Sequence, residues 1–232
     1  MRTGPNHENG VVAILDALGA ASYQPHEIER FLESRERVLR LFDAKAEDIF
    51  GEIRKENIAT FTFNDTILFI LRTGENAPRL RQISDFFRIM RKFLVDSLAN
   101  NIFFRGSIAI GRFYIDNETN TVMGEAVTDA AAWYDKADWI GVHATPRATL
   151  LIQHKIEHED SAKENVYIDY DVPVKGGLVV RAKAVNWPKV FFVNIITPCT
   201  DGTKPREKLL EFLTRFLHDG DTGRAVRMTG RC

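Results

Sequence analysis

The sequence has 232 residues, of which 44% are hydrophobic and 27% are charged. This balance is typical of a soluble globular protein with a core of ordinary size. The formal net charge of −1 gives no general affinity for nucleic acid or for anionic membranes. No run of about 18 consecutive apolar residues is present, so no membrane-spanning helix is predicted.

The cysteine content and the N-terminal sequence indicate the cellular compartment in which the protein is expected. Cys199 and Cys232 are too few for a disulfide framework, and such usage is typical of the reducing cytoplasm. Residues 1–9 lack an apolar stretch of signal-peptide length. The sequence therefore predicts a cytoplasmic protein with a flexible leader over 1–9.

The first half of the chain alternates between short apolar runs and long amphipathic stretches. Apolar residues recur at helical spacing in the long stretches, whereas the short runs are typical of strands. The predicted elements are a strand over 11–15, a helix over 25–47, strands over 58–63 and 66–71, a helix over 77–101, and a strand over 102–115 with a bulge at Gly106 or Gly111. This β-α-β-β-α-β order predicts an α+β fold with a ferredoxin-like core.

Further strands and helices are predicted after this core. They are a short strand running into a helix over 121–137, a helix over 145–155, strands over 165–174 and 178–185, and a helix over 205–219. No stretch of flexible composition divides the chain, so 10–198 is predicted to form one domain. The segment 199–232 is predicted to be a helix and basic tail packed on or trailing that domain, because 203–232 has seven Lys/Arg against four Asp/Glu.

Two aspartates stand at the ends of predicted strands. Asp16 follows the first strand, and Asp65 precedes the third, within FTFNDTILFI at 61–70. Taken alone, Asp16 is typical of a helix cap or loop, and Asp65 is typical of a turn. In a ferredoxin-like sheet, however, the first and third strands are antiparallel neighbours. The fold prediction therefore brings the two carboxylates to one edge of the sheet.

Two neighbouring carboxylates repel each other and need a shared proton or a cation. Their oxygen atoms suit Mg²⁺ or Mn²⁺, which bind through one or two carboxylates together with substrate phosphates. The segment ALGAA after Asp16 consists mostly of small residues and precedes a helix. Its backbone N–H groups are suited to holding a phosphate chain. A site for metal and phosphate is the resulting hypothesis.

Four segments carry a resemblance to a known family. AILDALGA at 13–20, FNDTILF at 63–69, FRGSIAIGRFY at 104–114 and VMGEAVTDAAAWYDKADWIGVHATP at 122–146 resemble the class III nucleotidyl cyclases in order and spacing. The likeness is greatest to the bacterial anti-phage branch, the Pycsar-type pyrimidine cyclases. It covers about residues 10–185, and it implies the α+β fold predicted above.

The resemblance implies roles for individual positions. Asp16 and Asp65 match the two metal-binding aspartates of the family, with the backbone of Ala17 beside them. Thr128 falls where the family has an asparagine that orients the ribose, and Lys175 resembles a late lysine that contacts the triphosphate. The loop whose backbone holds the triphosphate corresponds to Ala17, Leu18, Gly19 and Ala20.

Departures from the family pattern concern charge and base recognition. A glycine of the hairpin is Asn64 here, and the arginine that stabilises the transition state is Ala132. Adenylate cyclases have a lysine that reads adenine where this sequence has Phe61. An aromatic ring stacks on a base but offers its edge no hydrogen bond, so Phe61 favours a pyrimidine unless it faces the core. Candidates for the missing positive charge are Arg105, Arg112, Lys136 and Arg181.

The resemblance implies an enzyme that cyclises a pyrimidine nucleoside triphosphate, with UTP favoured over CTP, to the 3′,5′-cyclic monophosphate and pyrophosphate. It also implies two Mn²⁺ or Mg²⁺ ions per site, a homodimer with sites at its interface, and a separate cyclic-nucleotide-sensing effector in anti-phage defence. The alternatives are an inactive nucleotide-binding or interaction module, and a purine cyclase. A diguanylate-cyclase-like or polymerase-palm domain is disfavoured because FNDTI lacks the Gly-Gly-Asp/Glu-Glu-Phe hairpin.

Other chemically capable residues are interpreted as structural. The histidines His143, His154 and His158 do not form a convincing zinc set. The aromatic residues Trp133, Tyr134 and Trp139 are typical of packing, with contact to a dimer partner or a base as the alternative. The aspartates Asp129, Asp135 and Asp138 are typical of exposed charge.

Overall fold

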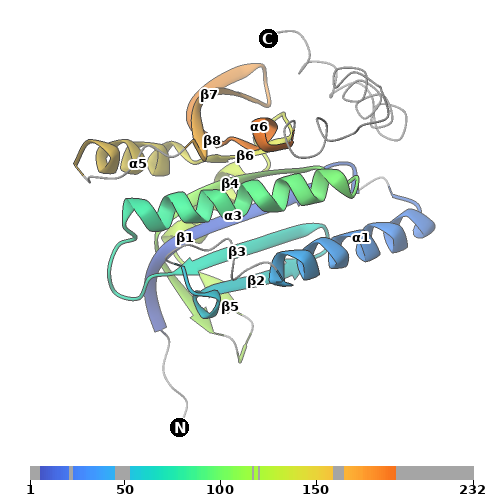
Figure 1. The fold of residues 1–232 in the computed structure, drawn as a ribbon, viewed down its shortest axis with the longest axis horizontal. Coiled ribbons are helices and arrows are strands. Elements are labelled where there is room, and N and C mark those ends of the chain that lie inside the picture. The colour runs from blue at the N-terminus through green and yellow to red at the C-terminus, as the bar shows by residue number, and fades with distance from the viewer. Residues whose placement is uncertain are drawn as a thin grey trace.

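The computed structural model describes residues 6–20, 23–44, 53–116, 118–119, 121–158 and 165–191. They form one sheet with helices packed on both of its faces (Figure 1). The helix predicted over 205–219, the basic tail and both cysteines lie outside the described residues. No helix in the described part is both long enough and apolar enough to cross a membrane.

The elements follow the predicted order. The first half consists of β1 (Asn6–Ala17), α1 (Pro25–Ala44), the short 3₁₀ helix η2 (Lys55–Asn57), β2 (Ile58–Phe63), β3 (Thr66–Arg72), α3 (Leu80–Ala99) and β4 (Phe104–Asp116). The second half consists of β5 (Thr121–Met123), α4 (Glu125–Trp133), β6 (Gly141–Ala144), α5 (Pro146–His158), β7 (Tyr167–Val174), β8 (Leu178–Val185) and α6 (Trp187–Phe191). Strand β6 and helix α6 were not predicted, because segments of four and five residues are too short to show a periodic pattern.

The strand order of the sheet is β2-β3-β1-β4-β6-β8-β7, with β5 paired to β4. Neighbouring strands are antiparallel except for β4 and β6, which are parallel. The first four strands of this order, with α1 between β1 and β2 and α3 between β3 and β4, form the ferredoxin-like arrangement. The predicted α+β class, with further strands and helices after the core, is therefore confirmed.

Strand β1 is longer than the apolar run that predicted it. Its pairing with β4 begins at Asn6, opposite Ile115, and continues to Ala17. Residues 6–9 therefore belong to the sheet, within the range 1–9 that was predicted to be a flexible leader. The first residues of β1 were not predicted as strand because they are polar, whereas the apolar central part of the strand is buried on both faces.

The predicted bulge in β4 is wrong. The β1–β4 register proceeds residue by residue past both Gly106 and Gly111 without an unpaired position. A Cβ atom on Gly106 would lie 2.4 Å from the carbonyl oxygen of Ile14. Glycine at 106 thus permits close approach of the β1 backbone, rather than an extra residue in the strand.

The larger core lies between the sheet and helices α1, α3 and α5. Figure 1 shows α1 and α3 lying over the same face of the sheet. Phe69 of β3 is fully buried there, and its ring centroid is 5.1 Å from that of Phe42 on α1 and 4.9 Å from that of Phe93 on α3. These aromatic contacts join both helices to the centre of the sheet.

Helix α4 packs on the opposite face, over β1 and β4. It buries Ala126 and Ala130 in an apolar cluster that includes Val12 and Ile14. The hydroxyl group of Ser107 on β4 donates a hydrogen bond to the carbonyl oxygen of Ala130 at 2.7 Å. The small residues of α4 therefore allow the helix to lie close to the strands, with its C-terminal end near the end of β1.

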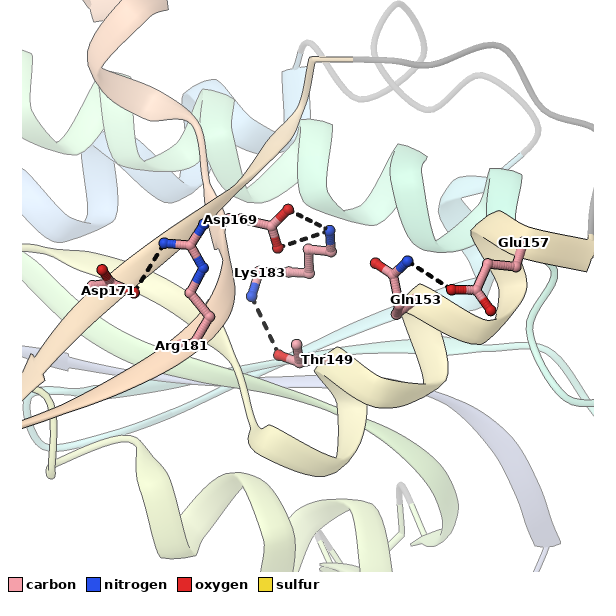
Figure 2. Close-up of polar contacts among 7 residues, drawn as sticks. All are labelled: Thr149, Gln153, Glu157, Asp169, Asp171, Arg181 and Lys183. Atoms are coloured by element: carbon pink, nitrogen blue, oxygen red, sulfur yellow. Dashed lines mark hydrogen bonds and ion pairs between the residues drawn. The ribbon is translucent and has the colours of Figure 1, made fainter.

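A buried lysine ties the β7–β8 hairpin to α5 (Figure 2). Lys183 of β8 is 6% exposed, and its ammonium group lies 2.8 Å from a carboxylate oxygen of Asp169 on β7. The backbone N–H of Lys183 donates to the hydroxyl oxygen of Thr149 on α5 at 3.2 Å. A buried ammonium group requires such pairing. The hairpin, which has Lys175 at its tip, consequently has a fixed base.

His143 of β6 is a buried titratable group, which predicts a pH-dependent stability. Its Nε2 atom has no hydrogen-bond partner among the described residues, and burial lowers the pKa of its imidazole. Because the unfolded chain takes up this proton at higher pH than the folded chain, the free energy of unfolding falls as the pH drops below the unfolded-state pKa of about 6.5. We expect a loss of up to about 1.4 kcal/mol per pH unit below that value in urea unfolding.

The matched variants for this measurement are His143→Asn and His26→Asn. The side chain of His26 is exposed at the start of α1, so its replacement should leave the pH slope unchanged. His143→Asn should flatten the slope, whatever it does to the stability at neutral pH. An unaltered slope in His143→Asn would show that other groups cause the acid sensitivity.

Candidate functional site

Asp16 and Asp65 lie at the same edge of the sheet. Asp16 is paired with Thr66 in the β1–β3 register, and Thr66 directly follows Asp65. The backbone N–H of Ala17 donates to the carbonyl oxygen of Asp65 at 3.2 Å. The turn between β2 and β3 uses Asn64 in the left-handed region, with φ of 53°, which asparagine adopts more readily than most residues. The hairpin thereby holds Asp65 beside the end of β1.

Arg105 of β4 is the ionic partner of Asp16. Its Nε and Nη2 atoms donate to the Oδ2 atom of Asp16 at 3.1 and 2.9 Å. The two side chains are only 15% and 16% exposed. Both hydrogen bonds go to Oδ2, so the Oδ1 atom of Asp16 has no hydrogen bond within the described part of the chain. One oxygen of this carboxylate is therefore available to a cation.

Charged groups at this edge act on one another. Burial raises the pKa of Asp16, Arg105 opposes this effect, and the charges of Asp65 and Asp135 raise the pKa further. Burial and the same three carboxylates also raise the pKa of the Tyr134 hydroxyl group. Tyr134 and Asp135 follow directly after α4, so the end of this helix belongs to the candidate site. Three interacting carboxylates with one partly buried guanidinium beside them favour the binding of additional positive charge.

The loop after β1 is partly occupied by the protein itself. The backbone N–H groups of Ala17 and Leu18 donate to the carbonyl oxygens of Asp65 and Phe103, at 3.2 and 2.8 Å. These two N–H groups hold the end of β1 between its neighbours. Of the four residues predicted to hold the triphosphate through their backbone, Ala17 and Leu18 therefore already use their N–H groups within the protein.

Phe61 lies on the same face of the sheet as Asp16. It is paired with Leu68 of β3, which is in turn paired with Ile14 of β1, two residues before Asp16. Residues two apart in a strand share a face. Phe61 is partly buried and packs against the apolar cluster beneath α4. The ring thus belongs neither to the larger core nor to open solvent.

Thr128 and Ala132 lie on the exposed side of α4. They are four residues apart and therefore share one stripe of the helix, whereas Ala126 and Ala130 face the sheet. This chain consequently turns Thr128 away from the sheet face that carries its own Asp16. The predicted contact of Thr128 with a ribose would have to be made to a site on another chain.

The candidates for the missing positive charge occupy different places. Arg105 is paired with Asp16 at the site. Arg112 and Arg181 form ion pairs with other carboxylates, on α4 and on β7. The ammonium group of Lys136 lies 4.5 Å from the centre of a tryptophan ring at the end of α4. Of these four side chains, Arg105 is the one that directly contacts a predicted metal-binding aspartate.

Lys175 lies in the turn between β7 and β8, against the end of α4. Its ammonium group is 3.4 Å from the Oδ2 atom of Asp135, and its backbone N–H donates to the carbonyl oxygen of Lys136 at 2.8 Å. Asp135 acts electrostatically on Asp16. The structure thus brings Lys175 to the border of the site that contains Asp16 and Asp65.

Sequence reasoning missed the part played by the end of α4. Asp135 was interpreted as an exposed charge and Tyr134 as a packing residue; Asp135 is 47% exposed and also raises the pKa of Asp16, and the carboxylates at the sheet edge raise the pKa of Tyr134. A usable signal was the chain order, because a helix that follows β4 and packs back over it must end near the start of β4.

The three histidines considered in the sequence lie apart in two elements. His154 and His158 stack on one another on α5, and His143 is buried on β6.

The carboxylates fit a divalent cation that is shared with a substrate. Among the described residues, no group of three or more His, Cys, Asp or Glu side chains is arranged to hold a metal. Mg²⁺ and related ions nevertheless bind through one or two carboxylates when substrate phosphates and water supply the other ligands. The Oδ1 atom of Asp16 and the neighbouring carboxylate of Asp65 match that requirement.

The solved structures that resemble the chain include two cyclases. The adenylyl cyclase CyaB from P. aeruginosa aligns with a TM-score of 0.47 and 13% identity, over 78% of this chain and 95% of its own. The catalytic core of a rhodopsin-guanylyl cyclase with converted specificity, in complex with ATPαS, aligns with a TM-score of 0.47 and 13% identity, over 79% of this chain and 98% of its own. No family model and no curated protein matches the sequence. Because similarity this low does not establish a shared activity, the functional proposal depends on the residues of this chain.

Proposed function

We propose that this protein is a nucleotidyl cyclase, which converts a nucleoside triphosphate to its 3′,5′-cyclic monophosphate and pyrophosphate with the help of divalent cations. The observation that carries the proposal is the meeting of Asp16 and Asp65 at one sheet edge, with Arg105 paired to Asp16. The resemblance of four sequence segments to class III cyclases supports the same activity.

The reaction is an intramolecular phosphoryl transfer. The 3′-hydroxyl group loses its proton as its oxygen forms a bond to the α-phosphorus, and the bond from the α-phosphorus to the bridging oxygen breaks to release pyrophosphate. Asp16 and Asp65, with the backbone of Ala17, would hold Mn²⁺ or Mg²⁺ ions, which supply Lewis-acid stabilisation of the negative charge. The remaining task of the protein is positioning and charge stabilisation.

Two basic side chains would bind the phosphate oxygens. The guanidinium group of Arg105 offers several N–H donors in a fixed plane, and it takes the place of the positive charge absent at Ala132. Lys175 approaches from the β7–β8 turn and contacts the triphosphate. Both residues border the carboxylate edge in this chain. Together they would neutralise the charge that accumulates on the leaving pyrophosphate.

The favoured substrate is a pyrimidine nucleotide, with UTP before CTP. Phe61 supports this choice, because its partly buried ring lies on the face of Asp16 and offers stacking without a hydrogen bond to a purine edge. The resemblance to the Pycsar-type cyclases adds a role as a cytoplasmic signal in anti-phage defence, with a separate effector that senses the cyclic nucleotide.

The decisive experiment is a product assay with the full-length protein. Each of the four nucleoside triphosphates is incubated with Mn²⁺, and the products are separated by chromatography. We expect cyclic UMP as the main product, accompanied by pyrophosphate. A cyclic purine nucleotide would retain the cyclase proposal and reject Phe61 as a pyrimidine determinant. Thermal stabilisation by triphosphate and Mn²⁺ without any product would instead identify an inactive nucleotide-binding module.

We also propose that the enzyme works as a homodimer with its sites at the interface. Thr128 lies on the exposed side of α4, turned away from Asp16 of its own chain, which supports its use at the site of a partner. A two-fold dimer then has two equivalent sites, each built from both chains.

Mixing two inactive variants tests this shared site. Asp65→Ala and Thr128→Ala should each lose most activity as pure dimers, by about tenfold or more for the threonine variant. After equimolar exchange of subunits, half of the dimers are mixed and each has one intact site, so activity should return to about a quarter of the wild-type value. Asp16→Asn mixed with Asp65→Ala serves as the control, because both changes fall in the same half of the site and should give no recovery. Absence of recovery in the first mixture would place both residues in one chain's site.

A further inference from the structure

Each basic side chain at the candidate site is already paired with a carboxylate of that site. Arg105 lies 2.9 Å from Asp16, and Lys175 lies 3.4 Å from Asp135. The two pairs differ in exposure, because the first is largely buried whereas the Lys175–Asp135 side chains are 46% and 47% exposed. The second pair can therefore exchange partners with a solute much more easily than the first.

The backbone holds Lys175 and Asp135 next to each other. The N–H of Lys175 donates to the carbonyl oxygen of Lys136 at 2.8 Å, directly after Asp135. The N–H of Asp138 donates to the carbonyl oxygen of Pro173 at 2.9 Å, and Ala137 forms a bridge with the strand beside Lys175. These two hydrogen bonds make up the bridge and join the segment after α4 to the β7–β8 turn, so the two side chains face each other as a result of the fold.

We propose that Asp135 is a built-in competitor of the substrate, which occupies Lys175 until a triphosphate displaces it. This inference rests on the proposed function, in which Lys175 contacts the triphosphate. Displacement exchanges one carboxylate for phosphate oxygens and requires no movement of the backbone. Asp135 then remains beside the bound nucleotide as an uncompensated negative charge close to Asp16. Nucleotide without its divalent cation is consequently bound weakly, whereas nucleotide together with cations is accepted.

Titration calorimetry with inorganic tripolyphosphate, in the absence of divalent cations, measures this competition on the full-length protein. Asp135→Asn should bind tripolyphosphate about two- to fivefold more tightly than wild type, the range expected for loss of an exposed ion pair. Lys175→Gln should bind it more weakly. Asp138→Asn is the matched control, because it removes the same charge three residues away, and among the described residues the side chain of Asp138 forms none of the ion pairs found near the site.

The double variant Asp135→Asn/Lys175→Gln distinguishes competition for Lys175 from a general electrostatic effect of removing one negative charge near the phosphate site. If Asp135 acts through Lys175, its replacement in the Lys175→Gln background should improve binding no more than Asp138→Asn does. Equal improvement by Asp135→Asn and Asp138→Asn in the wild-type background would overturn the proposal, as would weaker binding by Asp135→Asn. Those two results leave the phosphate site in place. Failure of wild type and all variants to bind tripolyphosphate would overturn the phosphate role of Lys175 itself, and with it that part of the proposed function.

Discussion

Replacing Asp65 with alanine is expected to lower cyclic nucleotide formation at least about a hundredfold, because even groups that only support a metal ligand contribute ten- to hundredfold. The fold should survive, since Asp65 lies in the β2–β3 turn and contributes its backbone, not its side chain, to the hydrogen bond with Ala17. The measurement is the initial rate of product formation with UTP and Mn²⁺, together with urea unfolding of the same protein. If the carboxylate is a ligand, any residual activity should need a higher Mn²⁺ concentration than that of the wild type, because loss of a ligand weakens cation binding.

The role of the Asp16 carboxylate in activity is tested with a more conservative substitution than alanine. This carboxylate is paired with the largely buried Arg105, and an alanine there would leave that guanidinium without a partner at a cost of about 3–5 kcal/mol. Asp16→Asn keeps the shape and one oxygen acceptor, so loss of activity with retained folding would point to the charge. Asp171→Asn is the control, because this exposed residue pairs with Arg181 on the β7–β8 hairpin. Near-normal activity of Asp65→Ala would remove the metal assignment.

The largest effect on stability is expected for Phe69→Ala. Phe69 is fully buried on β3 and contacts the rings of Phe42 and Phe93. Its truncation removes the contacts of the Phe69 ring with Phe42 on α1 and Phe93 on α3, and should lower the free energy of unfolding by about 3–5 kcal/mol. For a chain of this length, the melting temperature should fall by about 10 °C or more. Thermal and urea unfolding measure both quantities.

Phe63→Ala is the matched control on the neighbouring strand. The Phe63 side chain is 76% exposed, so the same chemical change should alter the free energy of unfolding by no more than about 0.5 kcal/mol. A small effect of Phe69→Ala, comparable to that of Phe63→Ala, would show that the aromatic cluster is not packed as the structure describes. A large effect of Phe63→Ala would instead indicate that this side chain is covered in a dimer.

The fold and the two central aspartates were predictable from sequence for a definite reason. Hydrophobic periodicity over long helices and strands determines the element order, and a β-α-β-β-α-β order has few arrangements other than the ferredoxin-like one. Once β1 and β3 are antiparallel neighbours, the positions of Asp16 and Asp65 at strand ends are enough to bring them together. Neither step requires knowledge of side-chain packing.

Other features were not predictable because they depend on contacts between distant segments. The choice of Arg105 among four basic candidates follows from its register opposite Asp16 on β4, and composition has no information on register. The bulge predicted at Gly106 or Gly111 was wrong because a glycine that allows close strand approach has the same sequence signature as a bulge. The strand β6 escaped notice because its four residues are too few for a pattern.

The order of elements, the ferredoxin-like core and the meeting of Asp16 with Asp65 can be deduced from the sequence, since they follow from local periodicity and strand direction. The charges that accompany the two aspartates become known from the folded chain alone. The fold pairs Arg105 with one oxygen of Asp16, brings Asp135 to the edge, and sets Lys175 against Asp135. The physical reason is that ion pairs form between groups that the sheet register and the packing of α4 place within a few ångströms, and those relations become fixed only when the whole chain is folded.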